Sequence, residues 1–192
     1  MSRPVVAPHT EGPQLTTPPR PAAFLDRDGV LNHDRGYVHR IEDFVWIDGA
    51  REAIALLGAA GYLTVMVTNQ SGIARGYYDE AALRRLHAHL QQDLARVGAT
   101  LDAWYFCPHL PDATVDEFRV DCACRKPKPG MLLRAAREHT IDLTSSLLIG
   151  DKPSDLEAAT AAGVCGFLFT GGDLAAFVRD VLSTVKSPQK QG

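Results

Sequence analysis

The sequence lacks several features that would assign the protein to a membrane, to nucleic acid or to secretion. It has no run of about 18 apolar residues, so no transmembrane helix is predicted. The formal net charge is only -3, which provides no broad basic surface for nucleic acid. The N-terminal residues contain no apolar segment typical of a secretory signal, and we find no internal repeat. We therefore expect a cytoplasmic protein with no membrane or nucleic-acid partner.

The length and the two ends suggest one domain. A chain of 192 residues can bury a hydrophobic core, and we expect this domain at residues 21–186. Residues 1–20 contain five of the twelve prolines and no hydrophobic periodicity, so they are predicted to be a disordered tail. Residues 187–192 are polar and are predicted to be a second disordered tail.

Strand-like and helix-like segments alternate between these tails. The expected strands are Ala22–Leu25, Leu63–Val67, Ala103–Phe106, Ser146–Ile149 and Cys165–Phe169. The expected helices are Ala50–Ala60, Asp79–Val97, Gly130–His139, Ser154–Ala162 and Asp173–Thr184. The alternation predicts an α/β fold, a Rossmann-like three-layer sandwich with a central parallel sheet. The spacing of the segments leaves no room for a large cap domain. Asp79 is the expected N-cap of its helix, in which His87 and His89 lie two residues apart and are expected at the surface.

Three of the four cysteines cluster with a histidine. Cys107 and His109 are separated by twelve residues from Cys122 and Cys124. These four side chains can hold Zn²⁺ in a closed tetrahedral site that stabilises the intervening loop, whereas reduced cysteines without a metal are the alternative. Cys165 lies apart and is expected to be a buried, unreactive thiol.

Two carboxylates follow the first predicted strand. Asp26 and Asp28 lie where the carboxyl end of a parallel strand usually places ligand-binding groups. Because side chains alternate along an extended chain, Asp26 and Asp28 are expected to share a side and Arg27 to point away. Neighbouring carboxylates repel each other unless a cation relieves them, which indicates Mg²⁺; the alternative is a solvated turn at Gly29.

Further motifs extend this pattern. Thr68-Asn69-Gln70-Ser71-Gly72 and Gly150-Asp151-Lys152 each follow a predicted strand, and Arg125-Lys126-Pro127 precedes a predicted helix. In this order they resemble the haloacid dehalogenase (HAD) phosphatase superfamily. The segments Asp26–Asn32 and Cys122–Pro127 are similar, within it, to the histidinol-phosphatase-like branch that includes the D-glycero-D-manno-heptose 1,7-bisphosphate 7-phosphatases. The resemblance covers about residues 22–170.

The resemblance implies a Mg²⁺-dependent mechanism through an aspartyl-phosphate. Asp26 would be the nucleophile, Asp28 the general acid and base, and Thr68 and Lys126 the residues that stabilise the phosphoryl group. Asp151 would bind Mg²⁺ together with the Asp26 carboxylate and the Asp28 backbone carbonyl.

Asp155 has two alternative interpretations. It is either a residue that supports the metal site or a carboxylate favoured at a helix start.

Polar residues around these motifs are the predicted substrate ligands. They are Asp34, Arg35, Gly36, Tyr37, Thr68, Asn69, Gln70, Ser71, Arg125, Lys126 and Lys152. Arg125 is expected to bind the distal phosphate bidentately. The predicted reaction removes the 7-phosphate of the heptose bisphosphate, a small phosphorylated sugar, in a monomeric enzyme of surface-polysaccharide precursor synthesis. Two alternatives stay open, namely a histidinol-phosphate phosphatase and an inactive zinc-binding module.

Overall fold

The computed structural model describes residues 18–186; the predicted tails lie outside these residues, apart from residues 18–20. The described residues form a five-stranded sheet whose order is β3-β2-β1-β4-β5. Its strands are β1 (Ala22–Leu25), β2 (Leu63–Asn69), β3 (Ala103–Cys107), β4 (Leu147–Gly150) and β5 (Cys165–Leu168). All neighbouring strands are parallel, which confirms the predicted central parallel sheet.

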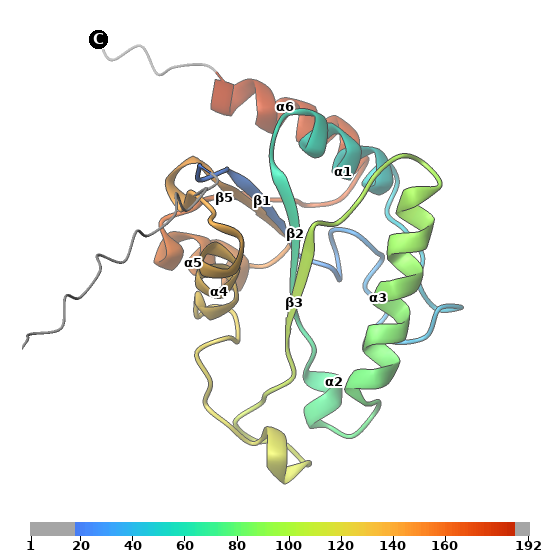
Figure 1. Ribbon diagram of the computed structural model, residues 1–192. Coiled ribbons are helices and arrows are strands. Elements are labelled where there is room, and N and C mark those ends of the chain that lie inside the picture. Colours follow the sequence, from blue (N-terminus) through green and yellow to red (C-terminus); the bar gives the residue numbers. More distant parts are fainter. Residues whose placement is uncertain (1–17, 187–192) are drawn as a thin grey trace, which may run out of the picture.

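Helices cover both faces of this sheet (Figure 1). The helices are α1 (Ala50–Ala59), α2 (Ser71–Ala74), α3 (Glu80–Ala95), α4 (Gly130–His139), α5 (Pro153–Ala162) and α6 (Leu174–Lys186), with short 3-10 turns at Asp116–Phe118 and Leu143–Ser145. Helices α1 and α6 lie side by side on one face, and α4 and α5 lie on the other. The three-layer α/β arrangement is therefore as predicted. None of the described helices is long and apolar enough to cross a membrane.

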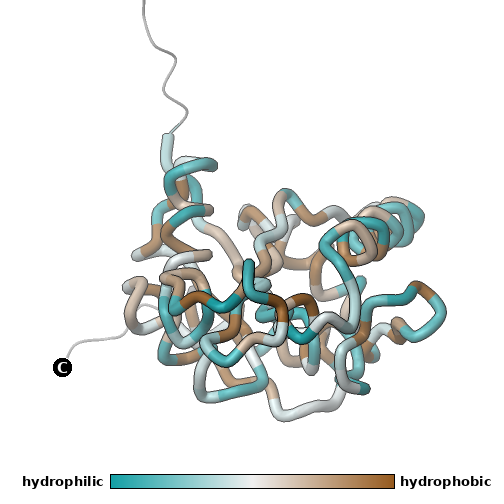
Figure 2. The backbone as a smooth tube through the Cα atoms, turned by 90° about the horizontal axis from the view of Figure 1, so that it is seen from below, coloured by the Kyte–Doolittle hydropathy of each residue, from teal (hydrophilic) through white to brown (hydrophobic). Residues whose placement is uncertain are grey.

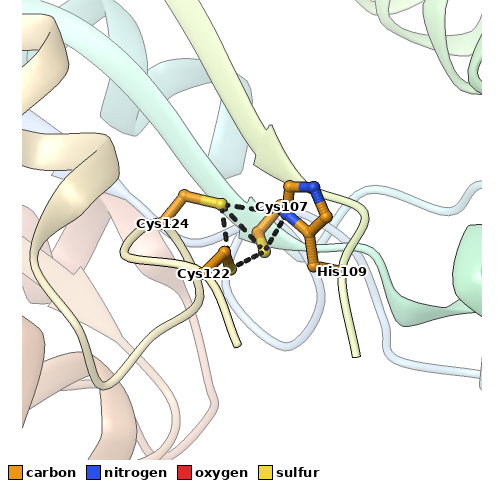
Figure 3. A group of neighbouring side chains, drawn as sticks. All are labelled: Cys107, His109, Cys122 and Cys124. Atoms are coloured by element: carbon orange, nitrogen blue, oxygen red, sulfur yellow. Dashed lines mark hydrogen bonds between the residues drawn. The ribbon is translucent and has the colours of Figure 1, made fainter. Parts of the chain in front are cut away.

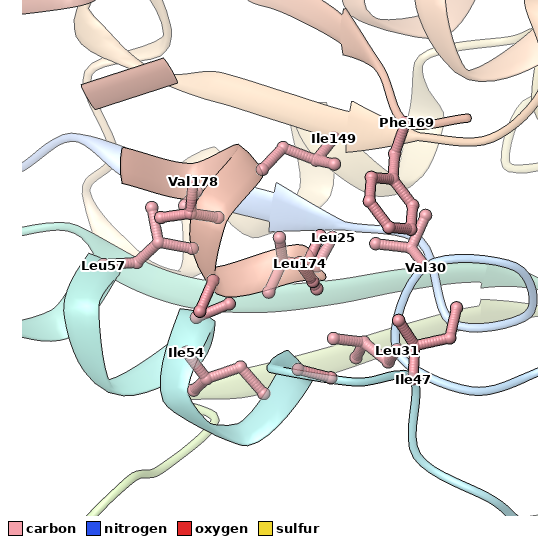
Figure 4. Packing of buried hydrophobic residues seen from close by; sticks show 14 of the residues in the cluster. Leu25, Val30, Leu31, Ile47, Ile54, Leu57, Ile149, Phe169, Leu174 and Val178 are labelled. Atoms are coloured by element: carbon pink, nitrogen blue, oxygen red, sulfur yellow. The ribbon is translucent and has the colours of Figure 1, made fainter. Parts of the chain in front are cut away.

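Each face of the sheet has its own hydrophobic core. Leu25 and Ile149 point to the α1 and α6 face, where they meet Ile54, Leu57 and Val178 (Figure 4). The alternate strand residues, such as Phe24 and Leu148, point to the α4 and α5 face. Hydrophilic and hydrophobic residues alternate along the outer helices (Figure 2), as expected when one helix face packs on a core and the other meets water.

The expected element boundaries agree with the structure to within two residues, and Asp79 caps α3 as predicted, with its side chain accepting from Ala82 N at 2.7 Å. Two other expectations are wrong. His87 is buried, at 1% exposure, because it lies on the same stripe of α3 as Leu83 and Leu90. Cys165 is exposed because β5 is an edge strand whose start is left uncovered.

Candidate active site

The carboxyl ends of β1, β2 and β4 bring three motifs together. Asp26 directly follows β1, Thr68 lies near the end of β2, and Asp151 directly follows β4. Gly29 turns the chain after β1 with φ 95°, and a Cβ atom there would lie 2.2 Å from Asp151 Oδ2. Glycine is therefore required at this turn, because any side chain would displace Asp151 from the edge of the sheet.

Lys126 lies in the middle of this cluster. Its Nζ is 2.9 Å from Asp26 Oδ1 and 2.6 Å from Asp155 Oδ1, and it donates to Val67 O at 3.0 Å. Lys126 as a whole is 4% exposed, so these three acceptors replace water around its ammonium group. The Asp155 carboxylate also accepts from Lys152 N at 3.0 Å at the start of α5. Asp155 is therefore a helix-start carboxylate, and it also pairs with Lys126; its support of a metal site stays a prediction.

Burial shapes the protonation of this cluster. Desolvation raises the pKa of Asp26 to about 7, against the lowering effect of the neighbouring Lys126. Desolvation disfavours the Lys126 ammonium, but Asp26 and Asp155 outweigh it and raise the pKa of Lys126. Desolvation also raises the pKa of Asp151. Burying carboxylates together costs free energy, and a bound cation would offset that cost.

The carboxylates of Asp26, Asp151 and Asp155 fit a divalent cation. Each offers an oxygen within 4.8 Å of the others. Asp151 Oδ1 is buried and has no hydrogen-bond partner among the described residues, which is the condition a hard oxygen ligand needs.

The Asp28 carboxylate is held separately from Asp26. Arg27 Nη2 lies 2.9 Å from both Asp28 oxygens, and Arg27 Nε is 3.2 Å from Oδ2. Gln70 Nε2 donates to Asp28 Oδ2 at 2.8 Å, and Asn32 Nδ2 donates to Oδ1 at 3.1 Å. The expectation that Arg27 points away from the site is thus wrong, because the chain leaves the extended conformation after Leu25 and the alternation stops there.

The amides after β2 are engaged within the protein. Both polar atoms of the Asn69 amide bind the Lys126 backbone, at 3.0 Å to its carbonyl and 3.1 Å from its N–H. Gln70 Nε2 also donates to Thr68 Oγ1 at 2.8 Å. Thr68 Oγ1 therefore acts as an acceptor here, and its own proton finds no acceptor among the described residues. Ser71 is half-buried at the start of α2.

The loop after β1 forms the outer edge of the site. Asp34 accepts from Gly36 N at 3.0 Å, and Lys152 Nζ lies 3.3 Å from Asp34 Oδ2 and 3.5 Å from Asp151 Oδ2. Lys152 thus bridges this loop to the metal-ligand candidates. Arg35, Gly36 and Tyr37 are exposed.

Tyr37 has a left-handed backbone, with φ 53°, and its ring lies 4.8 Å from that of Tyr77. Both rings are exposed, so they offer an aromatic surface where the loop that carries Asp34 meets the segment between α2 and α3.

The four predicted zinc ligands converge (Figure 3). Cys107 Sγ lies 3.4 Å from Cys122 Sγ and 3.2 Å from Cys124 Sγ, and His109 Nδ1 lies 3.3 Å from Cys124 Sγ. Ligand atoms of a tetrahedral zinc site are separated by roughly 3.5 to 3.8 Å, so only small adjustments are needed to enclose the ion. All four described cysteines are free thiols, and no disulfide competes with the site.

The cysteine cluster lies next to the residues that hold the Lys126 loop. Arg125 Nη1 donates to His109 O at 3.3 Å, and Gly130 N donates to Ala123 O at 3.0 Å. A Cβ atom on Gly130 would lie 2.3 Å from Ala123 O, so the loop packs directly on the start of α4. In Figure 1 this segment, between β3 and α4, extends below the sheet beside α2.

Sequence reasoning missed Arg27, Asn32 and Tyr78 as parts of the site. Tyr78 Oη donates to Gln70 Oε1 at 2.5 Å, and desolvation raises the pKa of Tyr78 to about 12. The only signal in the sequence was their proximity to the motif residues, and it does not indicate side-chain direction.

The fold and this site define a HAD-like hydrolase, and comparison with known proteins agrees. A family model described as HAD-hydrolase-like matches residues 123–182. A curated relative from Photorhabdus laumondii is 54% identical over 75% of this chain and 77% of its own length, and one from Rhodopseudomonas palustris is 48% identical over 87% and 93%. Both are named D-glycero-beta-D-manno-heptose-1,7-bisphosphate 7-phosphatase.

Among solved structures, the D,D-heptose 1,7-bisphosphate phosphatase from B. bronchiseptica, complexed with magnesium and phosphate, is 36% identical with a TM-score of 0.76. The match includes 99% of that protein's length and 85% of this chain. The chain belongs to the D-glycero-beta-D-manno-heptose-1,7-bisphosphate 7-phosphatase family, and the resemblance expected from its motifs is confirmed.

Proposed function

We propose that this protein removes the 7-phosphate of D-glycero-beta-D-manno-heptose 1,7-bisphosphate and releases the heptose 1-phosphate. The observation that carries the proposal is the contact between a buried carboxylate, Asp26, and a buried ammonium, Lys126, at 2.9 Å at the carboxyl end of β1. This pair supplies a nucleophile and a positive charge at one point. The names of the relatives support the sugar and its beta anomer.

Asp26 is the proposed nucleophile. Its Oδ1 accepts from Arg27 N at 2.7 Å and lies beside Lys126, whereas Oδ2 accepts no hydrogen bond from the described residues. Oδ2 is therefore the atom we assign to in-line attack on phosphorus. As the Asp26–phosphorus bond forms, the bond from phosphorus to the sugar oxygen breaks, and Asp28 in its acid form gives that oxygen a proton. The resulting Asp28 carboxylate then takes a proton from the water that hydrolyses the aspartyl-phosphate.

The other residues hold the phosphoryl group. Lys126 places an ammonium against its developing charge, and the Thr68 hydroxyl donates to a phosphoryl oxygen. Mg²⁺ bound by Asp26 and Asp151, with the Asp28 backbone carbonyl, would offset the repulsion between the carboxylate and an anionic substrate. Asp155 would keep Lys126 in place.

The outer residues determine the substrate. Arg125 is the proposed ligand of the distal phosphate, because it extends from the residue before Lys126 and a guanidinium binds phosphate bidentately. Asp34, Arg35, Gly36 and Tyr37, on the loop after β1, are proposed to contact the sugar together with Lys152, which precedes α5, and Ser71, at the start of α2. Asn69 and Gln70 act in this proposal by fixing Lys126, Thr68 and Asp28.

We further propose one structural Zn²⁺ held by Cys107, His109, Cys122 and Cys124. The four ligands leave no open position, so this metal has no direct chemistry. Its contribution is to order the loop that ends in Arg125 and Lys126. Retaining thiolates for zinc suits the reducing cytoplasm, where we place the protein as a monomer.

The test uses Asp26→Asn, which keeps the shape of the side chain but cannot form a stable acyl-phosphate. We expect kcat on the beta bisphosphate to fall by at least about a thousandfold with the fold retained. The matched control is Asp180→Asn on the exposed face of α6, which should keep wild-type kcat. Turnover by Asp26→Asn within tenfold of wild type would exclude Asp26 as the nucleophile. Higher kcat/KM on histidinol phosphate than on the bisphosphate would favour the alternative activity.

A further inference from the structure

Arg27 has the largest of the fully buried side chains among the described residues, and it lies beside the proposed active site. It is 0% exposed, although it carries a permanent charge. Its guanidinium reaches five acceptor atoms. They are both Asp28 oxygens, Val38 O at 2.6 Å, Gln70 Oε1 at 3.2 Å and His87 Nε2 at 3.5 Å. Burying a charge this completely is costly unless every donor is used, so the residue is built into the site and does not simply fill space.

The partners of Arg27 come from four separate parts of the chain. Asp28 follows β1, Val38 belongs to the outer loop, Gln70 follows β2, and His87 lies on α3. His87 must be the acceptor in its contact, because a guanidinium can only donate. Desolvation and the two nearby arginines, Arg27 and Arg84, lower the pKa of His87 to about 3, so the imidazole remains neutral and keeps this acceptor.

A second support reaches Asp28 from the surface. Tyr78 Oη donates to Gln70 Oε1, which leaves the Gln70 Nε2 group directed at Asp28 Oδ2. His39 stacks on the Tyr78 ring at 4.5 Å with an interplanar angle of 8°. The Asp28 side chain keeps 18% exposure although both of its oxygens accept hydrogen bonds.

We propose that Arg27 is a positioning residue for the proposed acid and base Asp28, and that His87 and Tyr78 hold the two ends of this arrangement. The proposal rests on the function proposed above. In this proposal Arg27 holds the Asp28 carboxyl group in place for proton transfer and does not itself touch the substrate. Lysine could keep the charge but not the planar set of donors that grips both oxygens.

Substrates whose leaving groups differ in basicity can distinguish a positioning role of Arg27 from a merely structural one. The sugar oxygen of the heptose bisphosphate must receive a proton as it leaves, whereas p-nitrophenolate leaves as a stable anion. Since kcat/KM reports the steps up to loss of the leaving group, an effect that acts through the acid should appear only with the sugar phosphate. A damaged fold would lower both values together.

The experiment measures kcat/KM on heptose 1,7-bisphosphate and on p-nitrophenyl phosphate. We expect Arg27→Lys to lower kcat/KM by about 10- to 100-fold on the bisphosphate, because small misplacements of a catalytic group cost factors of this size, and by less than about threefold on the aryl phosphate. In an Asp28→Asn background the same substitution should have no further effect on the bisphosphate. The matched control is Arg84→Lys, an exposed arginine of α3 that does not contact Asp28, and it should change neither value.

Equal losses on both substrates, or an undiminished loss in the Asp28→Asn background, would overturn the proposal. Should Arg27→Lys fail to fold, Tyr78→Phe provides the same comparison, with an expected loss of about three- to tenfold confined to the bisphosphate. A uniform effect of Tyr78→Phe, or none, would also overturn it. Failure of the proposed function would look different, because the wild type itself would then fail to turn over the bisphosphate, whatever it does with the aryl phosphate.

Discussion

Acid should destabilise this protein through one buried histidine. His87 is 1% exposed and lies against the rings of Trp104, at 5.9 Å, and Phe106, at 6.4 Å. The charged groups that face it are Arg27, from the loop after β1, and Arg84, from its own helix. Burial is the main cause that lowers the pKa of His87 to about 3, and the two cations add to it. No partner among the described residues accepts from its Nδ1.

The sign of the effect follows from proton binding. In the unfolded chain a histidine has a pKa of about 6.5, so between pH 6.5 and pH 3 the unfolded state binds a proton that the folded state does not. The contribution to stability is complete above about pH 6.5 and is lost as the pH falls. At about 1.4 kcal/mol per pH unit, moving from pH 7 to pH 5 should cost about 2 kcal/mol of unfolding free energy.

Urea unfolding of wild type, His87→Leu and His89→Leu at pH 7 and pH 5 tests this value. The pH-dependent loss in His87→Leu should be smaller than in wild type by about 2 kcal/mol, since leucine cannot take up a proton. His89 is the matched control on the same helix; because its side chain is 33% exposed and is not enclosed as His87 is, replacing it should leave the wild-type slope. Other titrating groups cancel in the differences. Parallel slopes for wild type and His87→Leu would refute the assignment.

Two further predictions concern the zinc loop and the distal phosphate. One zinc per chain should survive dialysis and be detected by elemental analysis; Cys122→Ser should lose it and Cys165→Ser should retain it, whereas a disulfide among the clustered cysteines would contradict the site. Arg125→Ala should lower kcat/KM on the bisphosphate about 10- to 100-fold more than on a monophosphate, because a charge-assisted contact to the second phosphate is lost. Equal losses on both substrates would assign Arg125 to the loop or to the reacting phosphate.

The sequence predicts the framework well because its signals are local. Leu83, Leu90 and Leu94 recur at helical spacing, and Asp79 precedes them as a cap, so the sequence alone predicts α3. Helix α2, at Ser71–Ala74, was not predicted, because four residues are too few to show a helical period. The exposure of Cys165 depends on which strand lies at the edge of the sheet. The strand order cannot be predicted from any single segment of the sequence.

The errors at the site have one cause, which is that side-chain direction was inferred from ideal periodicity. His87 and His89 do not share a helix face, but this spacing still allows one of the two to be buried. Its spacing of four from Leu83 and three from Leu90 already indicated which one. The direction of the Arg27 side chain cannot be inferred from strand alternation, because β1 ends at Leu25.

The proposed acid, Asp28, and the ammonium proposed to bind the phosphoryl group, Lys126, are held by different sets of contacts. Lys126 is delivered by a loop whose backbone is clamped by Asn69, at 3.0 and 3.1 Å, and whose start lies in the cysteine cluster. Asp28 is instead held by the buried guanidinium of Arg27. Removal of zinc should therefore weaken phosphoryl stabilisation on every ester, whereas loss of Arg27 should affect only esters whose leaving group needs a proton. The two kinds of damage can be distinguished with the same pair of substrates, because the two groups act on different oxygens of the phosphate ester.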